Sequence, residues 1–549
     1  MADLKHECGI AALYHFNPNI KSSVWGNDPD QVPDQIHTLM PRMLVDLQNR
    51  GQLAAGMSTL MPGREQLLET YKEVGLVAEA FRMSQKDKFD KIMRENAGRA
   101  VIGHTRYATS GPATRTYAQP FERRHGCKWK WFAFGFNGNL ANLKQLQDEI
   151  ESLGDYHLTR NNDTEVLMHL IGLELQGDKQ PNLVDVFTRL SKKLDGSYNI
   201  VFLNAMGELV VLRDPLGLRP VCYAVEGGVF GAASESVALQ NLGFRTVHSL
   251  QPGQMIHVQP GKMSIHQFAE SKSTSHCFFE WIYFANVAST LDERSVYLTR
   301  TKLGNELAKL ERQLNIISEE ELDDGNTIVV PVPDTAKAAA DGMAYALGIP
   351  CFEGLMRNRY VGRTFIEASK RADKVRVKFT PLKEVLKGKR VILVEDSIVR
   401  STTLATLLGF IKDQGEASEV HVRVACPPIV APCFYGIDMS QVTELFAPKH
   451  MAGDIPTRAE QQKMAKVLGA TSLAYLPLEA IARCIDLPEN RLCRACITGN
   501  YPTPNGEKLY QLSLRQADEK GGNGRAFGGR SQAVERSAHG ITEGTCQTI

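Results

Sequence analysis

Short hydrophobic runs typical of strands occur throughout the first half of the chain. Four such runs, rich in aromatic or β-branched side chains, cover residues 100–102, 131–136, 199–203 and 208–212. Residues 164–174 instead place apolar side chains at helical spacing. Because β-branched and aromatic residues favour strands, the region from Cys8 to about residue 258 is predicted to be an α+β domain built on sheets.

The pattern changes near residue 296, where expected helices and strands begin to alternate. In the order helix, strand, helix, strand, helix, strand, they cover residues 296–314, 327–332, 335–347, 390–394, 401–413 and 420–425. Such alternation predicts a parallel, doubly wound sheet. Ligands of such sheets bind beyond the carboxyl ends of the strands.

Length and charge narrow the possible functions. A chain of 549 residues is too long for one ordinary core, so roughly two or three domains are expected. The formal net charge of +1 gives no overall field to attract nucleic acid or a membrane surface, and neither is expected as a partner. No apolar run reaches the about 20 residues that span a bilayer, and residues 1–7 lack the apolar core of a secretory signal. We therefore expect a cytoplasmic protein whose eleven cysteines are thiols, metal ligands or a nucleophile rather than disulfides.

Cys8 is a candidate nucleophile, although a lone cysteine near a terminus is more often a small buried side chain. Six polar motifs follow it in order, at residues 49–52, 103–109, 137–140, 162–165, 213–220 and 233–236. This ordered set closely resembles the glutaminase domain of class II glutamine amidotransferases, which belong to the N-terminal nucleophile type. The resemblance extends from Cys8 to about Phe268.

The resemblance implies a catalytic role for three of these residues. Residues 1–7 would be a leader that is removed, so that the α-amine of Cys8 becomes the base for its own thiol. The side chain of Asn137 and the backbone N–H of Gly138 would stabilise the oxyanion.

Substrate binding is implied for three further residues of the same motifs. Arg106 would pair with the carboxylate of glutamine, where its bidentate fork fits, and Thr109 would support that contact. Asp163 would hold the substrate ammonium. Three other polar residues of these motifs are expected to be ordinary framework: Asn49, Asp214 and Arg219.

A second candidate site follows the strand at residues 390–394. Glu395 and Asp396 come directly after it and precede a polar loop and a helix. Carboxylates at a strand end suit ribose hydroxyls and Mg²⁺, and hydroxyls and N–H groups at a helix N-terminus suit phosphate. An acidic pair beside a loop is also common on surfaces, so this motif alone is weak.

Two further segments, residues 331–335 and 354–366, strengthen the interpretation of this motif as a substrate site. Residues 391–403 resemble the phosphoribosyl pyrophosphate loop of phosphoribosyltransferases, residues 331–335 their pyrophosphate loop and residues 354–366 their mobile lid. The resemblance implies two residue sets. Substrate would be bound by Arg357, Arg359, Arg363, Arg400, Ser401, Thr402 and Thr403, and Mg²⁺ by Thr335, Glu395 and Asp396.

The sequence departs from the family pattern of the phosphoribosyl pyrophosphate loop at two positions, and residues 283–287 also differ from the usual family sequence. Glu395 and Ser401 stand where relatives usually have aspartate and glycine. Two alternatives therefore stay open: a glutaminase that delivers ammonia to another acceptor, or a non-catalytic sensor of ribose phosphate.

Four cysteines are candidate cluster ligands. Cys493 and Cys496 form a C-x-x-C pair, which alone could bind zinc, act in redox chemistry or be incidental. The segments around Cys277, Cys433 and Cys496 resemble the ligand segments of the iron–sulfur branch of the amidotransferase family. The resemblance implies that Cys277, Cys433, Cys493 and Cys496 hold a [4Fe–4S] cluster as a structural staple. Tetrahedral zinc would need the same four thiolates, so their number does not decide between the metals.

Together the two halves resemble the glutamine phosphoribosylpyrophosphate amidotransferase family. The implied fold is an N-terminal nucleophile domain, with two sheets sandwiched between helices, followed by an α/β phosphoribosyltransferase domain with a parallel sheet. The expected divisions are a leader at 1–7, a glutaminase domain at 8–268, a transferase domain at 269–470, a cysteine-bearing segment at 471–515 and a disordered tail at 516–549.

The implied reaction makes phosphoribosylamine from glutamine and phosphoribosyl pyrophosphate, the first committed step of purine synthesis. The resemblance also implies a homotetramer, inhibition by purine nucleotides and passage of ammonia through an internal channel.

Overall fold

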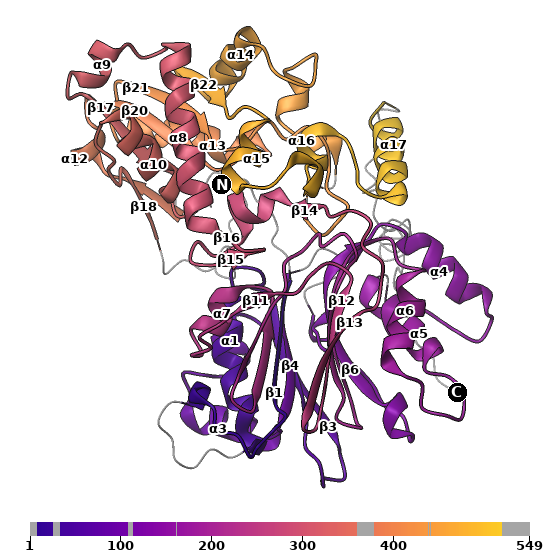
Figure 1. Cartoon of the computed structure of the whole chain (residues 1–549). Helices are drawn as coiled ribbons and strands as arrows, with labels where there is room; N and C mark the ends of the chain where they lie inside the picture. Colours follow the sequence, from indigo (N-terminus) through magenta and orange to yellow (C-terminus); the bar gives the residue numbers. More distant parts are fainter. Residues whose placement is uncertain are drawn as a thin grey trace, which may run out of the picture.

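The computed structural model describes residues 8–25, 33–107, 114–160, 162–358, 378–437, 439 and 441–518. Figure 1 shows a strand-rich N-terminal half, coloured indigo to magenta, and a second half in orange and yellow whose sheet is covered by helices. Within the described residues, no helix has both the length and the apolar character needed to cross a membrane.

The N-terminal half contains two antiparallel sheets. The first has seven strands in the order β11-β9-β10-β1-β4-β2-β3. They are β1 (Gly9–His15), β2 (Ala54–Leu60), β3 (Leu68–Val74), β4 (Ala100–Arg106), β9 (Cys222–Glu226), β10 (Val229–Ala233) and β11 (His248–Ser249). The second has six, in the order β13-β12-β8-β7-β6-β5. They are β5 (Phe121–Arg123), β6 (Phe132–Leu140), β7 (Gly196–Asn204), β8 (Leu209–Arg213), β12 (Gln254–Gln259) and β13 (Lys262–Gln267).

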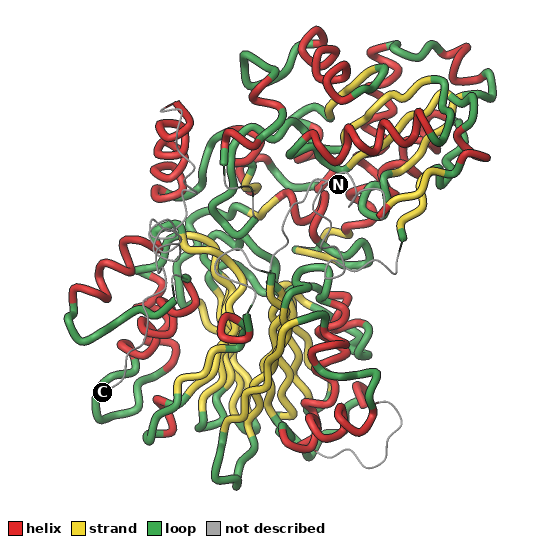
Figure 2. The backbone as a smooth tube through the Cα atoms, turned by 180° about the vertical axis from the view of Figure 1, so that it is seen from behind, coloured by secondary structure: helices red, strands yellow, loops and turns green. Residues whose placement is uncertain are grey.

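Helices cover the outer face of each sheet, so the half is a four-layer sandwich (Figure 2). The first sheet packs on α1 (Met40–Asp46), α2 (Val77–Ala80), α3 (Lys86–Glu95) and α7 (Ser236–Gln240). The second packs on α4 (Leu143–Ser152), α5 (Asp163–Glu174) and α6 (Leu183–Ser191). This arrangement confirms the predicted sandwich.

Strand β1 shows why its sequence is apolar at nearly every position. Successive side chains of a strand point to opposite faces. Ile10 and Ala12 face the second sheet, whereas Ala11 and Leu13 face the helices. Because both faces are buried, alternation with polar residues is lost.

The second half is built on a four-stranded parallel sheet in the order β17-β20-β21-β22. Its strands are β17 (Thr327–Pro331), β20 (Arg390–Glu395), β21 (Glu419–Val424) and β22 (Ser472–Tyr475). Its main helices are α8 (Val296–Leu314), α10 (Lys337–Leu347), α13 (Ser401–Asp413) and α14 (Arg458–Leu468). Helices α8 and α13 have the predicted bounds, whereas α10 begins at Lys337 instead of residue 335. Strand β22 lies beyond residue 470, so the sheet continues into the segment expected only to carry cysteines.

Short elements connect the two halves. β14 (His276–Cys277) pairs in parallel with β23 (Leu492–Cys493), and a buried π-helical turn, η5, covers Glu280–Phe284. The other short elements are β15 (Thr290–Leu291), β16 (Arg294–Ser295), α9 (Glu319–Asp323), β18 (Leu355–Arg357), β19 (Phe379–Pro381), α12 (Lys383–Leu386), α15 (Ala480–Ile485) and α16 (Ala495–Thr498).

The last described helix is α17 (Pro504–Asp518). It includes residues 516–518, the first three residues of the segment expected to be a tail. Its Asn505 donates from its backbone and its side chain to Asp195, at 3.1 and 2.7 Å, and these contacts dock the helix on the N-terminal half. Residues 519–549 lie outside the described part of the chain.

Candidate active sites and a four-cysteine cavity

Cys8 lies directly before β1, at one end of the first sheet. Its side chain is partly exposed, and Sγ donates to the carbonyl of Tyr107 at 3.6 Å. Tyr107 follows β4, which pairs with β1 through Gly9 and Thr105. The pairing therefore places the thiol beside the segment that carries the expected glutamine-binding residues.

Ser234 links the nucleophile strand to the expected oxyanion residue. Its hydroxyl accepts from the backbone N–H of Ile10 at 3.0 Å and from Nδ2 of Asn137 at 3.4 Å. Ile10 belongs to the first sheet and Asn137 to β6 of the second. The hydroxyl therefore fixes Asn137 relative to the strand that begins next to Cys8.

Gly138 has a backbone that only glycine can adopt without strain. Its φ is +155°, and a Cβ at this position would lie 1.9 Å from the carbonyl oxygen of Ser197 on the paired strand β7. The lack of a side chain allows β6 and β7 to approach closely at this point. Gly138 therefore continues the strand directly after Asn137 despite its unusual backbone.

Arg106 and Asp163 lie close enough to influence each other's charge. Arg106 ends β4, and its guanidinium lies 5.5 Å from the ring of Tyr117. Burial lowers the pKa of Arg106, and the charges of Cys8 and Asp163 oppose that shift. Burial raises the pKa of Asp163 to about 6, and Arg106 opposes that shift in turn. The structure thus brings Cys8, Arg106 and Asp163 into one electrostatic neighbourhood.

Local sequence explains how Asp163 is held. It is the first residue of α5, where the side chain of Asn162 caps the helix by accepting from the N–H of Glu165 at 2.9 Å. A carboxylate is favoured at a helix N-terminus. Thr109, expected to assist Arg106, lies outside the described residues.

The three residues expected to be framework make structural contacts. Asn49 donates to Glu235 at 2.7 Å and to the carbonyl of Phe284 at 3.0 Å. Asp214 accepts from the backbone of its own turn. Arg219 is buried and donates to the carbonyl of Tyr435.

The second candidate site lies at the carboxyl ends of β17 and β20. These strands are neighbours, with Pro331 opposite Val394. The hydroxyl of Thr335, beyond β17, donates to the carboxylate of Asp396, which also accepts from Ser397 at 2.8 Å. Sheet pairing therefore unites Thr335 and Asp396 from separate motifs.

Both acidic residues of this site are buried. Glu395 is 1% exposed and Asp396 is 3% exposed. Burial raises the pKa of Glu395 to about 7, and the neighbouring charge of Asp396 adds to that rise. Two buried carboxylates side by side repel each other, so a bound cation would stabilise their ionised forms.

Five of the residues expected to bind phosphate lie in the described part of the transferase half. Ser401, Thr402 and Thr403 are the first three residues of α13. Arg400 precedes them and pairs with Glu444. Arg357 ends β18 and pairs with Asp334 at 2.6 Å. Two further expected arginines lie outside the described residues, Arg359 and Arg363.

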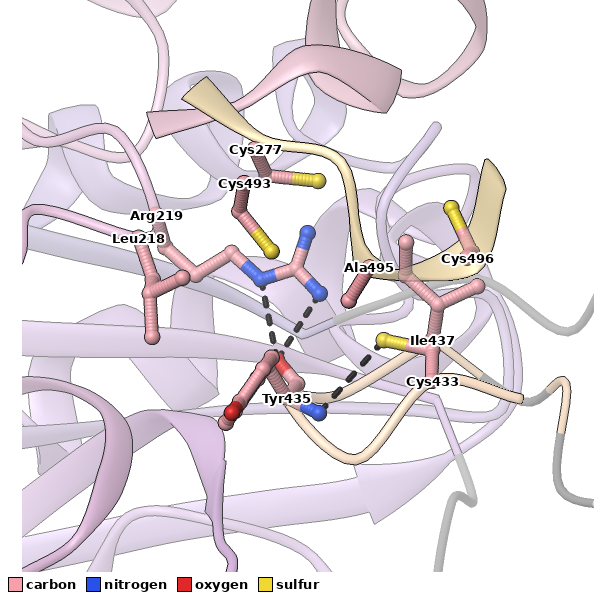
Figure 3. Close-up of a pocket in the computed structure, with 9 residues that line it drawn as sticks. All are labelled: Leu218, Arg219, Cys277, Cys433, Tyr435, Ile437, Cys493, Ala495 and Cys496. Atoms are coloured by element: carbon pink, nitrogen blue, oxygen red, sulfur yellow. Dashed lines mark hydrogen bonds between the residues drawn. The ribbon is translucent and has the colours of Figure 1, made fainter. Parts of the chain in front are cut away.

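A separate cavity collects the four candidate cluster ligands, as Figure 3 shows. Cys277 and Cys493 are opposite each other on β14 and β23, Cys496 lies on α16, and Cys433 accepts a hydrogen bond from the N–H of Tyr435 at 3.4 Å. The full lining is Leu218, Arg219, Cys277, Cys433, Tyr435, Ile437, Cys493, Ala495 and Cys496.

The chemistry of this cavity suits a metal centre. Burial raises the pKa of Cys493 to about 12 and that of Cys496 well above its ordinary value, and the charges of neighbouring cysteines add to both rises. Thiolates here would therefore need a positive centre. The fit is one of donor type and not of spacing, because among the described residues no group of three or more His, Cys, Asp or Glu side chains converges closely enough to hold a metal as the side chains stand. The four thiols share one cavity, and their donor set fits either a [4Fe–4S] cluster or zinc.

Two family matches cover the two halves of the chain. Residues 104–241 match the family of glutamine amidotransferase domains, and residues 301–428 match the family of phosphoribosyl transferase domains. The amidophosphoribosyltransferase of Methanothermobacter thermautotrophicus is 36% identical over 92% of this chain and 96% of its own. That of Pyrococcus horikoshii is 38% identical over 91% and 97%, and that of Bacillus subtilis is 34% identical over 92% and 96%. The chain belongs to the amidophosphoribosyltransferase family.

Solved structures agree with this membership. The glutamine phosphoribosylpyrophosphate amidotransferase of B. subtilis, complexed with ADP and GMP, has a TM-score of 0.75 and 32% identity, covering 91% of this chain and 98% of that one. An allosteric regulatory enzyme of purine biosynthesis has a TM-score of 0.76 and 32% identity, covering 90% and 96%. The predicted family and the predicted order of glutaminase and transferase domains are therefore confirmed.

The sequence offered no reason to assign a role to two buried residues near these sites. Ser234 lies in a motif that carried the resemblance, but its role depends on two strands that only the fold brings together. Arg300 lies on the buried face of α8 and donates to the carbonyls of Trp281 and Ala285, both at 2.9 Å. Burial lowers the pKa of Arg300 to about 10, and the charge of Asp396 opposes that shift. Its only sequence signal was a basic residue on the apolar side of an amphipathic helix.

Proposed function

We propose that the protein transfers the amide nitrogen of glutamine to phosphoribosyl pyrophosphate and so forms phosphoribosylamine, as the first step of purine synthesis. The observation that carries the proposal is the presence of both half-sites on one chain. Cys8, Arg106 and Asp163 form one electrostatic neighbourhood in the glutaminase half. Thr335 and Asp396 meet at neighbouring strand ends in the transferase half.

The glutaminase reaction would begin at Cys8. Its thiolate attacks the amide carbon of glutamine, a C–S bond forms, and the C–N bond then breaks to release ammonia. Water hydrolyses the thioester to glutamate. The α-amine of Cys8 would take the thiol proton once residues 1–7 are removed.

The surrounding residues would bind glutamine and stabilise the oxyanion. The amide of Asn137 and the N–H of Gly138 would donate to the oxyanion, and one such donor typically contributes about 3–4 kcal/mol. Arg106 would pair with the substrate carboxylate, and Asp163 with its ammonium. The link through Ser234 supports this assignment, because it holds Asn137 beside the nucleophile strand.

The transferase reaction would use the ends of β17 and β20. Ammonia, carried internally so that bulk water does not protonate it, attacks the anomeric carbon, the bond to pyrophosphate breaks, and the new amine loses a proton. Asp396 and Glu395 would hold the ribose hydroxyls and the metal together with Thr335. Bound Mg²⁺ would neutralise charge on the departing pyrophosphate.

Cationic and hydroxyl side chains would bind the phosphates. The first turn of α13, with Ser401, Thr402 and Thr403, suits the 5′-phosphate because its N–H groups point outward at a positive helix end. Arg357 and Arg400 would bind substrate phosphates, together with Arg359 and Arg363 of the expected lid.

The four-cysteine cavity would hold a [4Fe–4S] cluster with a structural role. It is lined from β14, from the segment around Cys433 and from β23 and α16, so a bound cluster would join the C-terminal segment to the transferase half and to the connection between the halves. The resemblance of the surrounding sequences favours iron–sulfur over zinc.

Regulation and assembly are also proposed from relatives. The B. subtilis structure contains ADP and GMP, which supports purine nucleotides as inhibitors of this protein. We further propose a cytoplasmic homotetramer.

One incubation tests the function. Purified protein would be mixed with glutamine, Mg²⁺ and phosphoribosyl pyrophosphate, and pyrophosphate and glutamate would be measured together. Equal release of both products is expected. Release of glutamate without pyrophosphate would instead support transfer to a different acceptor. Release of neither product would support a non-catalytic sensor.

A further inference from the structure

A short transferase-half loop, residues 434–436, is held by two side chains of the glutaminase half. Asn139 donates from Nδ2 to the carbonyl of Phe434 at 3.0 Å. Arg219 donates from Nη2 and Nε to the next carbonyl, that of Tyr435, at 2.8 and 3.1 Å. Both side chains are buried, so two consecutive carbonyls of one half are fixed by the other.

The same loop lies against the expected oxyanion glycine. A Cβ on Gly436 would lie 3.6 Å from the carbonyl carbon of Gly138 and 3.7 Å from its oxygen. It would also lie 3.4 Å from Nη2 of Arg219. The backbone of Gly436, at φ +113°, is therefore a near neighbour of the backbone of Gly138, and a side chain at position 436 would reach van der Waals contact with it.

These contacts matter because the residues that they involve lie next to the expected oxyanion residues on β6. Asn137, Gly138 and Asn139 are consecutive, and they pair with Asn199, Tyr198 and Ser197 of β7. Stabilisation of an oxyanion depends on donors aimed within a few tenths of an ångström. A hydrogen bond on Asn139 and a contact on Gly138 therefore act on the peptide groups that set this aim.

We propose that the loop at residues 434–436 positions the oxyanion strand of the glutaminase site, which makes Asn139 and Arg219 positioning residues for glutamine hydrolysis. The inference rests on the proposed function, because it assumes that Asn137 and Gly138 stabilise the oxyanion. It adds that the glutaminase half needs the transferase half for full activity even when no ammonia is transferred.

The first test replaces the side chain on the glutaminase side. Asn139→Ala should lower kcat for glutamine hydrolysis by about tenfold or more, with a much smaller change in KM, because a misaimed donor affects the transition state more than binding. Synthesis from free ammonia and alkylation of Cys8 by iodoacetamide should change by less than about twofold. Asn96→Ala is the matched control, since Asn96 is equally buried and donates to the carbonyl of Ile92 at 2.9 Å within its own half. It should keep the wild-type kcat.

The second test changes a residue of the transferase half. Gly436→Ala adds a methyl group against Gly138 and Arg219, and it should lower glutaminase kcat although the residue belongs to the other half. Gly469→Ala is its control, because Gly469 also has a positive φ, +82°, but a Cβ there meets nothing within 4 Å. Gly469→Ala shows the effect of replacing a positive-φ glycine where the new side chain meets nothing, so a glutaminase defect in Gly436→Ala alone reflects its place beside Gly138 and Arg219.

The outcomes separate the two hypotheses. Wild-type protein without glutamine hydrolysis would overturn the proposed function and the coupling with it. Wild-type hydrolysis that persists unchanged in Asn139→Ala and Gly436→Ala would overturn only the coupling. Equal loss of the glutamine and ammonia reactions would also overturn it, because that result reflects general loss of structure.

Discussion

Cys277 and Cys493, far apart in the sequence, are opposite each other on the parallel strands β14 and β23. Both line the cavity shared with Cys433 and Cys496. This pairing attaches the C-terminal segment to the start of the connection between the two halves. A metal centre here would therefore stabilise the arrangement of domains rather than either reaction.

The first prediction concerns that centre. Protein purified without oxygen should be brown and contain about four irons per chain, as a [4Fe–4S] site requires. Cys433→Ser should abolish the iron and lower the Tm, because the remaining thiols would be left without a complete ligand set. Iron and sulfide analysis with thermal unfolding is the measurement, and Cys127→Ser, outside the cavity, is the control. Stoichiometric zinc without iron or sulfide would contradict the assignment.

The second prediction concerns the nucleophile. Cys8→Ala should reduce glutamine-dependent synthesis by at least about 10³-fold and leave ammonia-dependent synthesis intact, since the two reactions use different halves of the chain. Intact mass of active protein should show that residues 1–7 are absent. Full glutaminase activity with Met1 still attached would exclude the α-amine of Cys8 as base.

The third prediction is a pH dependence. Burial raises the pKa of Asp163 from its ordinary value of 3.8 to about 6, so the carboxylate proposed to bind the substrate ammonium forms mainly above that pH. The kcat/KM for glutamine should therefore fall about tenfold per pH unit below about 6. Ammonia-dependent synthesis, corrected for ammonia ionisation, should lack this Asp163-dependent fall. Asp163→Asn should have a low kcat/KM without the same limb, and an unchanged limb in that variant would assign the titration to another group.

The raised pKa of Asp163 also predicts how the stability of the folded protein changes with pH. Because the folded-state pKa of Asp163 is raised, its favourable contribution is present below the unfolded pKa and is lost as pH rises through about 6. Asp163→Asn should remove this dependence. Comparison of Tm across the interval from pH 3.8 to about 6 measures it, because the wild-type Tm should fall relative to that of Asp163→Asn as pH rises through this interval.

The fifth prediction concerns the transferase site. Asp396→Asn should lose most ammonia-dependent synthesis while glutamine hydrolysis persists, because Asp396 contacts Thr335 at the strand ends of the transferase half, whereas Cys8 belongs to the glutaminase half. Glu395→Asp should be mild, since the charge is kept and the side chain is one methylene shorter. If Asp396→Asn leaves synthesis and the affinity for phosphoribosyl pyrophosphate unchanged, this loop is not the substrate site.

A substitution at Ser401 tests the second departure from the family pattern. Ser401 is the first residue of α13 and has a helical backbone, so its side chain brings no positive-φ strain. Ser401→Gly should therefore leave ammonia-dependent kcat within about threefold of wild type, because its hydroxyl contributes at most one hydrogen bond to phosphate. A larger loss would assign Ser401 a direct role.

Local pattern determined the elements that carry the sites. The buried strand before Glu395 and the helix after Arg400 were predicted from apolar runs and helical spacing, because both signals lie within a few residues. Strand β22 was missed, since four residues give too short a pattern to distinguish a strand from a loop. The composition from residue 516 onward predicts a tail, and the last described helix, which docks through Asn505, extends to Asp518.

The sequence by itself determined which chemical groups are present and in what order, and through the family resemblance it indicated the reaction. Only the tertiary structure decided which groups meet. Ser234 links Ile10 to Asn137, Arg300 comes near Asp396, and Asn139 reaches Phe434, each across elements that no sequence spacing relates. The physical reason is that strand pairing and burial are non-local: a hydrogen bond between distant segments leaves no periodic signal in either one.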